Sequence, residues 1–353
     1  MAAMAKPPLH QLHTQQAGCL PAAQLLDDLL AAPTPAGGKP LAVTVQLHVD
    51  EIPEISSTQN NFTLNGFLDV AWCDSRLAAE LLPQEQARAY ANEGAVDFLK
   101  THWNPQITFI NELGSAEGDD FTVVIHRDGV AEISRRTQVK LQSNFDLVRF
   151  PFDRQILEAD IESFAWDEKL LRFTNQSSIT LSSRFDIPDW KLEGVLVRIG
   201  SFLDPDHGYR AFSRLDAGIK VQRKSEFYLY KIFMPLGILT FTSIFFLAIP
   251  IGAMGDRVGF VSGLLFTNLA YQLIISSSVP KVPYFTLGDR YTLFLFFFMV
   301  AEVFIAYGIS LVARFGFPAG KITVDQVERV FEIVLPIIFI FVNIWFLAVM
   351  NWN

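Results

Sequence analysis

Four long apolar segments after residue 226 constrain the fold of this chain most strongly. They cover residues 227–250, 257–279, 290–313 and 330–350. A helix rises about 1.5 Å per residue and the hydrocarbon core of a bilayer is about 30 Å thick, so each segment is long enough to cross it. The 32 phenylalanines are concentrated in this part of the 353-residue chain. The sequence therefore predicts a membrane domain of four helices over residues 225–353, preceded by a large soluble domain.

The soluble part has the pattern of a series of strands. Apolar and polar residues alternate along residues 41–49 and again along residues 62–72, which is the period of a strand with one buried face. Only residues 77–101 look helical or irregular. Many short strands separated by turns predict a β-sandwich over residues 41–224. Further strands are expected at residues 106–111, 121–126, 130–141, 154–162, 178–184, 192–201 and 211–223.

Residues 1–40 are rich in Ala, Pro, Gln and Gly and are expected to form an amino-terminal extension. Within them the leucines of Pro21–Ala32 fall at helical spacing, which predicts a short amphipathic helix. A basic start followed by an apolar core is lacking, so the extension does not match a signal peptide. The formal net charge of −9 argues against nucleic acid as a partner, because nucleic acid selects basic surfaces.

Cys19 and Cys73 match neither a metal site nor a redox motif in their spacing. We expect two unpaired thiols, because Cys19 lies in a segment that looks peripheral; a disulfide between them is the less favoured alternative. Motifs of hydrolases and metalloproteases, such as Gly-x-Ser-x-Gly and His-Glu-x-x-His, are also lacking. No enzyme activity, cofactor or metal is therefore expected.

The second apolar segment is more polar than a helix that faces only lipid. Its middle carries Ser262, Thr267, Asn268, Tyr271 and Gln272. In hydrocarbon each polar group must find a partner or face water. Either these side chains hydrogen-bond to neighbouring helices, or the helix lines a water-filled path. The segment alone leaves both interpretations open.

A short loop between two predicted strands carries a family resemblance. Phe150-Pro151-Phe152-Asp153, with Asp146 before it and Gln155 after it, resembles the signature loop of the pentameric ligand-gated ion channels, the Cys-loop receptor superfamily. Ser143 and Leu157 stand where animal members have a disulfide, as in bacterial members. The likeness covers about residues 41–350 and is strongest to the prokaryotic branch that responds to small amines. Other matching positions are Trp72, Trp103-Asn104-Pro105, Arg223, Pro235 and Pro280-Lys281-Val282-Pro283-Tyr284.

The resemblance implies an immunoglobulin-like sandwich above a four-helix membrane domain, assembled as a homopentamer around a central pore. An agonist bound between sandwich domains would open this pore. The implied partners are four identical subunits, the bilayer, a small amine and monovalent cations. The implied location is a bacterial inner membrane, with the amino-terminal domain periplasmic or extracellular. A membrane-anchored ligand sensor with the same fold and no conductance remains an alternative.

The resemblance also implies that the second membrane helix lines the pore. Rings of Phe266 and Leu273 would then gate by dewetting a narrow apolar constriction. The sequence departs from the family pattern here, since the main gate ring is usually Leu and small polar residues usually replace Gly259 and Gly263. These glycines are alternatively a Gly-xxx-Gly packing pair. The expected pore-facing residues are Gly259, Gly263, Phe266, Ala270, Leu273 and Ser277.

Asp256 would form a ring of five carboxylates at the cytoplasmic end of the pore. Such a ring attracts cations and repels anions. Anion-selective members of the family typically show a Pro-Ala pair where this chain has Gly255-Asp256, so we expect cation selectivity. The simpler interpretation is that Asp256 stabilises the start of its helix, and both roles are compatible.

The family binds agonists in a box of aromatic side chains between subunits. Each aromatic face attracts an ammonium group by about 0.5–2 kcal/mol, and Glu162 would add a charge partner. Phe67 would come from the adjacent subunit. Taken singly, each aromatic residue is as readily explained by core packing. The expected ligand-binding residues are Phe67, Asn111, Glu162, Phe164, Trp166, Tyr209 and Phe212.

The family places Asp153 and Arg223 together where the sandwich meets the membrane. The resemblance thus implies a coupling role for this pair. Considered without it, each is an ordinary surface charge, and a surface pair contributes only about 0–1 kcal/mol. The expected coupling residues are Asp146, Asp153, Arg223, Pro283 and Tyr284.

Overall fold

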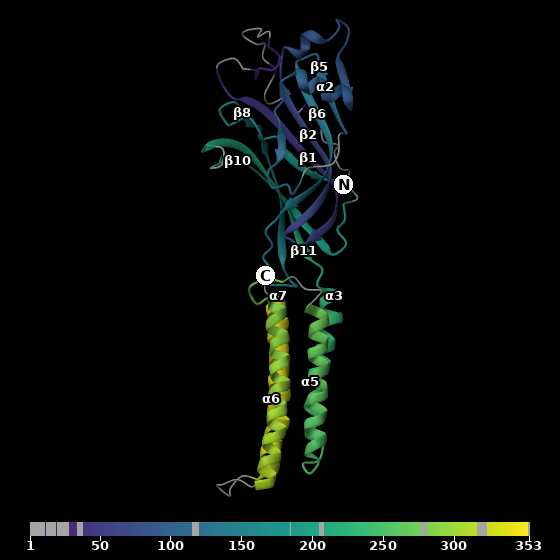
Figure 1. Cartoon of the computed structure of the whole chain (residues 1–353), viewed down its shortest axis with the longest axis vertical. Coiled ribbons are helices and arrows are strands. Elements are labelled where there is room, and N and C mark those ends of the chain that lie inside the picture. Colours follow the sequence, from purple (N-terminus) through teal and green to yellow (C-terminus); the bar gives the residue numbers. More distant parts are fainter. Residues whose placement is uncertain are drawn as a thin grey trace. The chain divides into compact units, whose positions relative to one another are not determined.

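The structure is a computed structural model of the whole chain. The residues that it describes form two compact units, one comprising Met1–Phe145 and Gln155–Gln222 and the other Asp146–Arg154 and Arg223–Asn353 (Figure 1). The described residues are 11, 19, 28–33, 38–114, 120–183, 185–204, 208–276, 281–315 and 323–351, without the side chains of 274–276, 347 and 349–351.

The first unit is a two-sheet β-sandwich, as the alternating pattern predicts. In its described part, one sheet has seven strands in the order β3-β5-β6-β2-β1-β8, with β9 also paired to β1, and the other has four in the order β10-β11-β7-β4. The first sheet contains β1 (Leu41–Ser56), β2 (Asn61–Cys73), β3 (Ala87–Ala91), β5 (Phe121–His126), β6 (Val130–Gln142), β8 (Leu171–Phe173) and β9 (Ser178–Leu181). The second contains β4 (Ile107–Phe109), β7 (Arg154–Ser163), β10 (Trp190–Asp204) and β11 (Arg210–Arg223).

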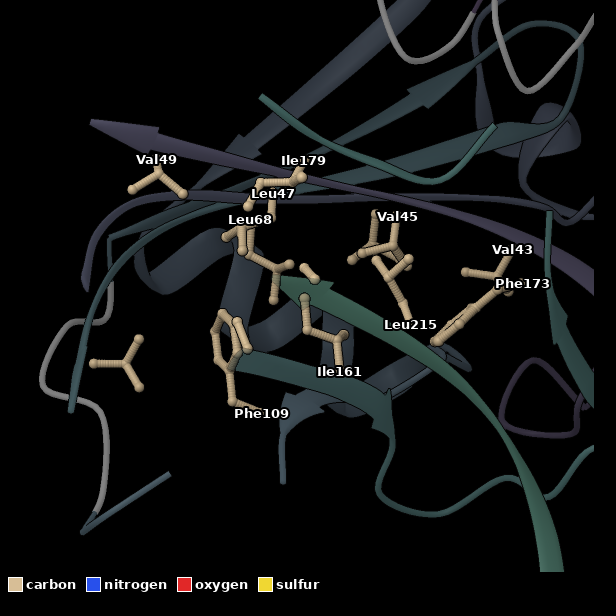
Figure 2. Packing of buried hydrophobic residues seen from close by; sticks show 14 of the residues in the cluster. Val43, Val45, Leu47, Val49, Leu68, Phe109, Ile161, Phe173, Ile179 and Leu215 are labelled. Carbon is tan, nitrogen blue, oxygen red and sulfur yellow. The ribbon is translucent and has the colours of Figure 1, made fainter. Parts of the chain in front are cut away.

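The core of the sandwich lies between the two sheets. Every second residue of β1 points inward, and Val43, Val45 and Leu47 are fully buried. Figure 2 shows them facing Ile161 of β7 and Leu215 of β11 in the opposite sheet. Alternation along each strand therefore leaves the opposite face of β7 and β11 free to carry polar side chains.

Two short helical segments and two short strands complete this unit. The 3-10 turn η1 (Leu77–Glu80) and α2 (Glu93–Thr101) lie in the region expected to be helical or irregular. Strand β3 also lies there, and β8 is too short to show a period. Neither strand was predicted, because three to five residues hold too few repeats of the pattern.

The two cysteines are joined, so the expectation of unpaired thiols was wrong. Cys19 forms a disulfide with Cys73, with Cα atoms 5.4 Å apart. Gly129, at φ +84°, allows this approach, because a Cβ there would lie 3.2 Å from the Cys19 sulfur and 2.9 Å from Ser75 Cα. The contact joins positions 54 residues apart in sequence, which local patterns cannot reveal.

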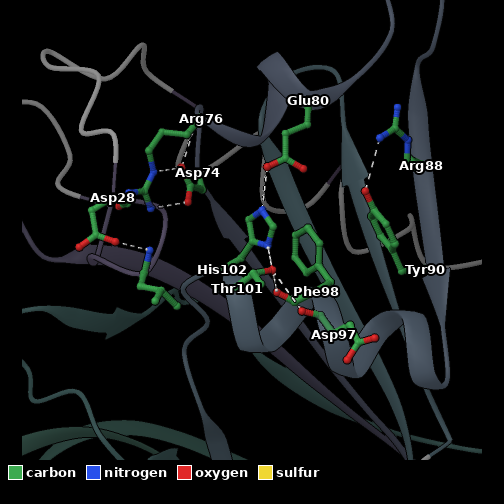
Figure 3. A network of polar contacts seen from close by, with 11 residues as sticks. Asp28, Asp74, Arg76, Glu80, Arg88, Tyr90, Asp97, Phe98, Thr101 and His102 are labelled. Carbon is green, nitrogen blue, oxygen red and sulfur yellow. Dashed lines mark hydrogen bonds and ion pairs between the residues drawn. The ribbon is translucent and has the colours of Figure 1, made fainter.

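A buried arginine attaches the segment before β1 to the same end of the sandwich. Arg76 donates to the main-chain oxygens of Asp28 at 2.7 Å and Ala31 at 2.9 Å. Its charge is balanced by buried Asp74, 2.7 Å away (Figure 3). Residues 28–31 are thus held on the sandwich; most of the amphipathic helix expected at Pro21–Ala32 lies outside the described residues.

The second unit is helical. Its first apolar segment is a continuous run of helical turns that includes a π-helical turn just before Pro235, which has no N–H to donate. Tyr271 satisfies the main-chain oxygen of Lys231, four residues before Pro235, by donating its hydroxyl. The elements are α3 (Glu226–Tyr228), η2 (Leu229–Phe233), α4 (Met234–Ser243), η3 (Ile244–Ala248), α5 (Met254–Ser276), α6 (Leu287–Phe315) and α7 (Val324–Asn351).

Three helical stretches in the described part are long and apolar enough to cross a membrane. They are Glu226–Ala248, Leu287–Phe315 and Val324–Phe346. Helix α5 has 23 residues, which is a sufficient length, but its glycines, hydroxyls and amides lower its hydropathy. Four membrane spans were predicted from the sequence. Helix α5 is the one whose hydropathy is too low to identify it as a membrane span by composition alone.

The polar residues of α5 divide between two faces. Asn268 is fully buried against α6, where its amide nitrogen lies 3.6 Å from the sulfur of Met299. Gln272 donates to Asn268 at 2.7 Å. Hydrogen bonding to neighbouring helices therefore explains this face of α5, and it leaves the other face unexplained.

Candidate functional site

The outward face of the four-stranded sheet carries a buried ion pair. Because β7 and β11 are neighbours, Glu162 and Arg214 meet on this face. Arg214 donates from Nε and Nη2 to Glu162 Oε2 at 3.1 Å each. The side chains are only 15% and 8% exposed for Arg214 and Glu162, so this is a specific partly desolvated contact rather than a surface encounter.

An aromatic ring completes the arrangement around Arg214. The guanidinium carbon lies 3.5 Å from the ring centroid of Phe202 on β10, well within the range of a cation–π contact. A carboxylate and an aromatic face are the two groups that bind an organic cation, and here both hold Arg214. Sequence reasoning missed Phe202 and Arg214, because the register of the long strand β10 against β11 cannot be read locally.

The aromatic residues predicted to form the box differ in their exposure. Phe164 and Tyr209 are exposed. Phe212 lies two residues before Arg214 on β11 but is only 2% exposed, with Arg210 5.4 Å from its ring. Trp166 is partly buried, packs against Trp103 at 5.6 Å and donates from Nε1 to a main-chain oxygen at 3.0 Å. Of these aromatic residues, Phe164 and Tyr209 are the ones with exposed side chains.

The two remaining candidates, Asn111 and Phe67, lie apart from this group. The Asn111 amide nitrogen donates to the main-chain oxygens of Gln142 at 2.8 Å and Glu158 at 2.7 Å, so Asn111 ties the loop after β4 to neighbouring strands. Phe67 lies on β2, in the other sheet, and is partly exposed. Its assignment to the site of an adjacent subunit stays a prediction.

A cavity of about 720 Å³ lies beside Arg214 on the same sheet face. Its lining includes Asp160, Glu158 and Asp216. The pKa of Asp160 is raised to about 6, mainly by burial and to a lesser extent by the neighbouring carboxylates of Asp216 and Glu158. Three carboxylates therefore lie close together on this face.

The predicted coupling pair is buried, so the interpretation of Asp153 and Arg223 as surface charges was wrong. Arg223 donates from Nε to Asp153 Oδ1 at 2.8 Å and from Nη2 to Oδ2 at 3.1 Å. Their side chains are 0% exposed for Asp153 and 8% for Arg223. Breaking such a buried pair by removing one partner costs about 3–5 kcal/mol.

The loop that contains Asp153 also closes the start of α6. The main-chain N–H groups of Leu287 and Gly288 donate to Val148 and Phe150 at 2.8 and 3.0 Å. These loop oxygens therefore take two of the donors that a helix start leaves unpaired. A Cβ at Gly288 would lie 3.0 Å from the Phe233 ring, so glycine is needed for this approach.

Three other predicted coupling residues lie around the same loop. The N–H of Leu147 donates to the Tyr284 hydroxyl at 3.1 Å. Asp146 accepts from the N–H of Val148 at 3.0 Å and so shapes the turn. Pro283 lines, with Tyr284, a cavity of about 620 Å³ in this unit. The predicted coupling set is thus brought together within the second unit.

One face of α5 is open along its length. Phe266 and Leu273 are 70% and 73% exposed, and a Cβ at Gly259 or Gly263 would meet no atom within 4 Å. Ala270 is also exposed, and spacings of three and four residues put all five on one side. Among the residues that the structure describes, nothing packs closely against these two glycines; Ser277 lies outside the described residues.

The start of α5 separates two neighbouring charges. Asp256 is exposed in the first turn. Arg257 is buried, donates from Nε to the main-chain oxygen of Ile249 at 2.6 Å and forms an ion pair with Glu328 of α7. The positive charge is therefore balanced inside the bundle, and the carboxylate of Asp256 faces outward.

A β-sandwich joined to membrane-length helices, with a buried ion pair closing the loop over α6, defines a two-domain membrane receptor. The sequence profile described as "Neurotransmitter-gated ion-channel ligand binding domain" matches residues 22–224. The chain therefore belongs to the pentameric ligand-gated ion channels of the Cys-loop superfamily, which confirms the resemblance seen in the sequence.

Individual relatives cover most of the chain at low identity. The "Proton-gated ion channel" of Gloeobacter violaceus is 23% identical, over 90% of this chain and 85% of its own length. The "Gamma-aminobutyric acid receptor subunit beta-4" of Gallus gallus is 23% identical over 77% of this chain, and the rho-3 subunit of Homo sapiens is 24% identical over 81%. The aligned parts span 56% and 62% of those two receptor subunits.

Proposed function

We propose that this chain is the subunit of a homopentameric, ligand-gated and cation-selective channel. Residues 41–224 would bind the agonist between subunits, and residues 225–353 would cross the membrane, with the amino-terminal domain periplasmic or extracellular at a bacterial inner membrane. The observation that carries the proposal is the exposed stripe of α5 formed by Gly259, Gly263, Phe266, Ala270 and Leu273.

The composition of α5 supports a pore-lining role. The buried amide of Asn268 contacts Met299 of α6, whereas the other face of α5 combines two glycines with large apolar side chains. Five such helices around an axis would give a wide inner segment and apolar constrictions at Phe266 and Leu273. Apolar constrictions gate by excluding water. A helix that faced lipid would gain nothing from the two open glycines.

Cation selectivity rests on Asp256. Since the neighbouring Arg257 is buried and paired with Glu328, its positive charge does not offset that of the exposed carboxylate. Five copies of Asp256 at the mouth of the pore would concentrate cations and repel anions. The helix-stabilising role of the same carboxylate is compatible with this function.

Two stimuli fit the structure. A small amine suits the acidic outward face of the four-stranded sheet with Phe202, Phe164 and Tyr209. Protons are the second candidate, favoured by the pKa of Asp160 near 6 and by similarity to a relative named as proton-gated. Either stimulus would act through the Asp153–Arg223 pair, which joins the loop over α6 to the strand that leads into the first membrane helix.

Currents in oocytes, recorded while small amines and pH are scanned, test the proposal. We expect a cation current in the wild type, and for Asp256→Asn a reversal potential shifted toward that of anions. Asp325→Asn is the matched control, because it removes an exposed carboxylate from the first turn of α7, and it should leave the reversal potential unchanged. Equal behaviour of both variants would contradict the role of Asp256. Silence of a folded pentamer under all conditions would favour the non-conducting sensor.

A further inference from the structure

We propose that Arg214 is a built-in occupant of the cation site formed by the Glu162 carboxylate and the Phe202 ring, and that it sets how tightly an organic cation can bind there. This inference rests on the proposed function, which places the agonist site on this face. The site would admit an organic cation only when the guanidinium of Arg214 leaves it. Arg214 then competes with the ligand and lowers the affinity of the site for every small organic cation.

The geometry around Arg214 is that of a bound ligand. Two of its nitrogens donate to one oxygen of Glu162 at 3.1 Å, and its guanidinium carbon lies 3.5 Å from the centroid of Phe202. A charged donor on a carboxylate and a cation on an aromatic face are the contacts by which proteins hold ammonium and guanidinium compounds. The side chain of Arg214 makes both contacts at once.

The comparison with Arg198 shows that this geometry is specific. Arg198 lies on the same sheet face and pairs with Asp216 at 2.8 Å, but its side chain is 83% exposed. Among the described residues, no aromatic ring lies against Arg198. On this sheet face Arg214 therefore fills a partly buried site with an aromatic wall, whereas Arg198 forms a solvent-exposed ion pair.

A displaced Arg214 has a place to go. The cavity of about 720 Å³ beside it is lined by Asp160 and Asp216 as well as by Arg214 and Phe202. The positive charge of Arg214 already acts on Asp160, whose pKa it lowers against the larger effects of burial and neighbouring acids. Rotation toward Asp160 would keep the guanidinium paired while a ligand cation takes its place on Glu162.

Competition by a tethered group lowers apparent affinity by the fraction of molecules in which the site is free. If Arg214 fills the site in nine molecules out of ten, removing it raises the affinity for a small cation by about tenfold. The gain should apply to methylguanidinium and propylammonium alike, since both can contact a carboxylate and a ring. It should require Glu162, because the carboxylate supplies the charge.

Isothermal titration of the detergent-solubilised full chain with methylguanidinium chloride, at constant ionic strength, tests the inference. We expect Arg214→Gln to bind at least about tenfold more tightly than the wild type, and the Glu162→Gln/Arg214→Gln double variant to lose this gain. Arg198→Gln is the matched control and should bind as the wild type does. No gain in Arg214→Gln, or an equal gain in Arg198→Gln, would overturn the inference.

A second variant covers the case in which Arg214→Gln does not assemble. Arg214→Ala leaves a guanidinium-sized space, so added methylguanidinium should restore its assembly, measured by size-exclusion chromatography. Failure of this rescue would also overturn the inference. Binding is measured without current, so a gain in affinity in a protein that never conducts supports the inference and counts against the channel. A ligand-evoked current with no gain in affinity supports the channel and counts against the inference.

Discussion

Removing Arg223 should destabilise the protein far more than removing an exposed arginine. Arg223→Gln leaves Asp153 with no exposed surface and without its two charged hydrogen bonds at 2.8 and 3.1 Å. Loss of one partner of a buried ion pair costs about 3–5 kcal/mol, because the remaining charge stays desolvated. Arg198→Gln removes an exposed partner of Asp216 and should cost about 0–1 kcal/mol.

Thermal unfolding of the detergent-solubilised chain measures this difference. About 1 kcal/mol shifts the unfolding temperature by roughly 2–4 °C in a chain of 150–250 residues and by less in a longer one, so Arg223→Gln should lower it by several degrees more than Arg198→Gln does. The Asp153→Asn/Arg223→Gln double variant also removes the buried carboxylate charge and should recover part of the loss. An unfolding temperature for Arg223→Gln equal to that of Arg198→Gln would refute the reasoning from burial.

Two further predictions concern the soluble domain. Cys19→Ser/Cys73→Ser removes a crosslink across 54 residues and should cost about 2–4 kcal/mol; thermal unfolding checks it, and an unchanged midpoint under non-reducing conditions would contradict it. The folded-state pKa of Asp160, about 6, lies above its ordinary 3.8, so its stabilising protonation is complete below about pH 4 and is lost as pH rises through 6. The unfolding temperature of the wild type should therefore fall between pH 4 and pH 6 relative to that of Asp160→Asn, and parallel curves would contradict the assignment.

The fold could be predicted because its main elements carry their own periodicity. The alternation along β1 determines which side chains enter the core. The apolar segments that form α6 and α7 predict membrane helices by their length alone. The signature loop Phe150-Pro151-Phe152-Asp153 added the family, since four residues of that composition between strands are a specific motif. The profile match over residues 22–224 confirms the membership in this family.

Contacts between distant segments could not be predicted. Asp153 and Arg223 are 70 residues apart, and a local pattern cannot show that both become buried. The disulfide between Cys19 and Cys73 could not be predicted for the same reason, because its cysteines are 54 residues apart. Phe202 escaped notice because it is one of many outward-facing positions on β10, and only the register of that strand places it over Arg214. The chemistry of the candidate site therefore depends on pairings between strands.

We propose that the open face of α5 lines a conducting pore, and cysteine modification tests this most directly. Since Cys19 and Cys73 are joined, a new cysteine can be modified with a cationic methanethiosulfonate reagent. Ala270→Cys lies on the open face, and Val261→Cys lies on the buried face of the same helix. If this face lines the pore, we expect the reagent to reduce the evoked cation current irreversibly in Ala270→Cys and to leave Val261→Cys unaffected. Equal sensitivity of the two, or current through Ala270→Cys that the reagent does not change, would contradict it.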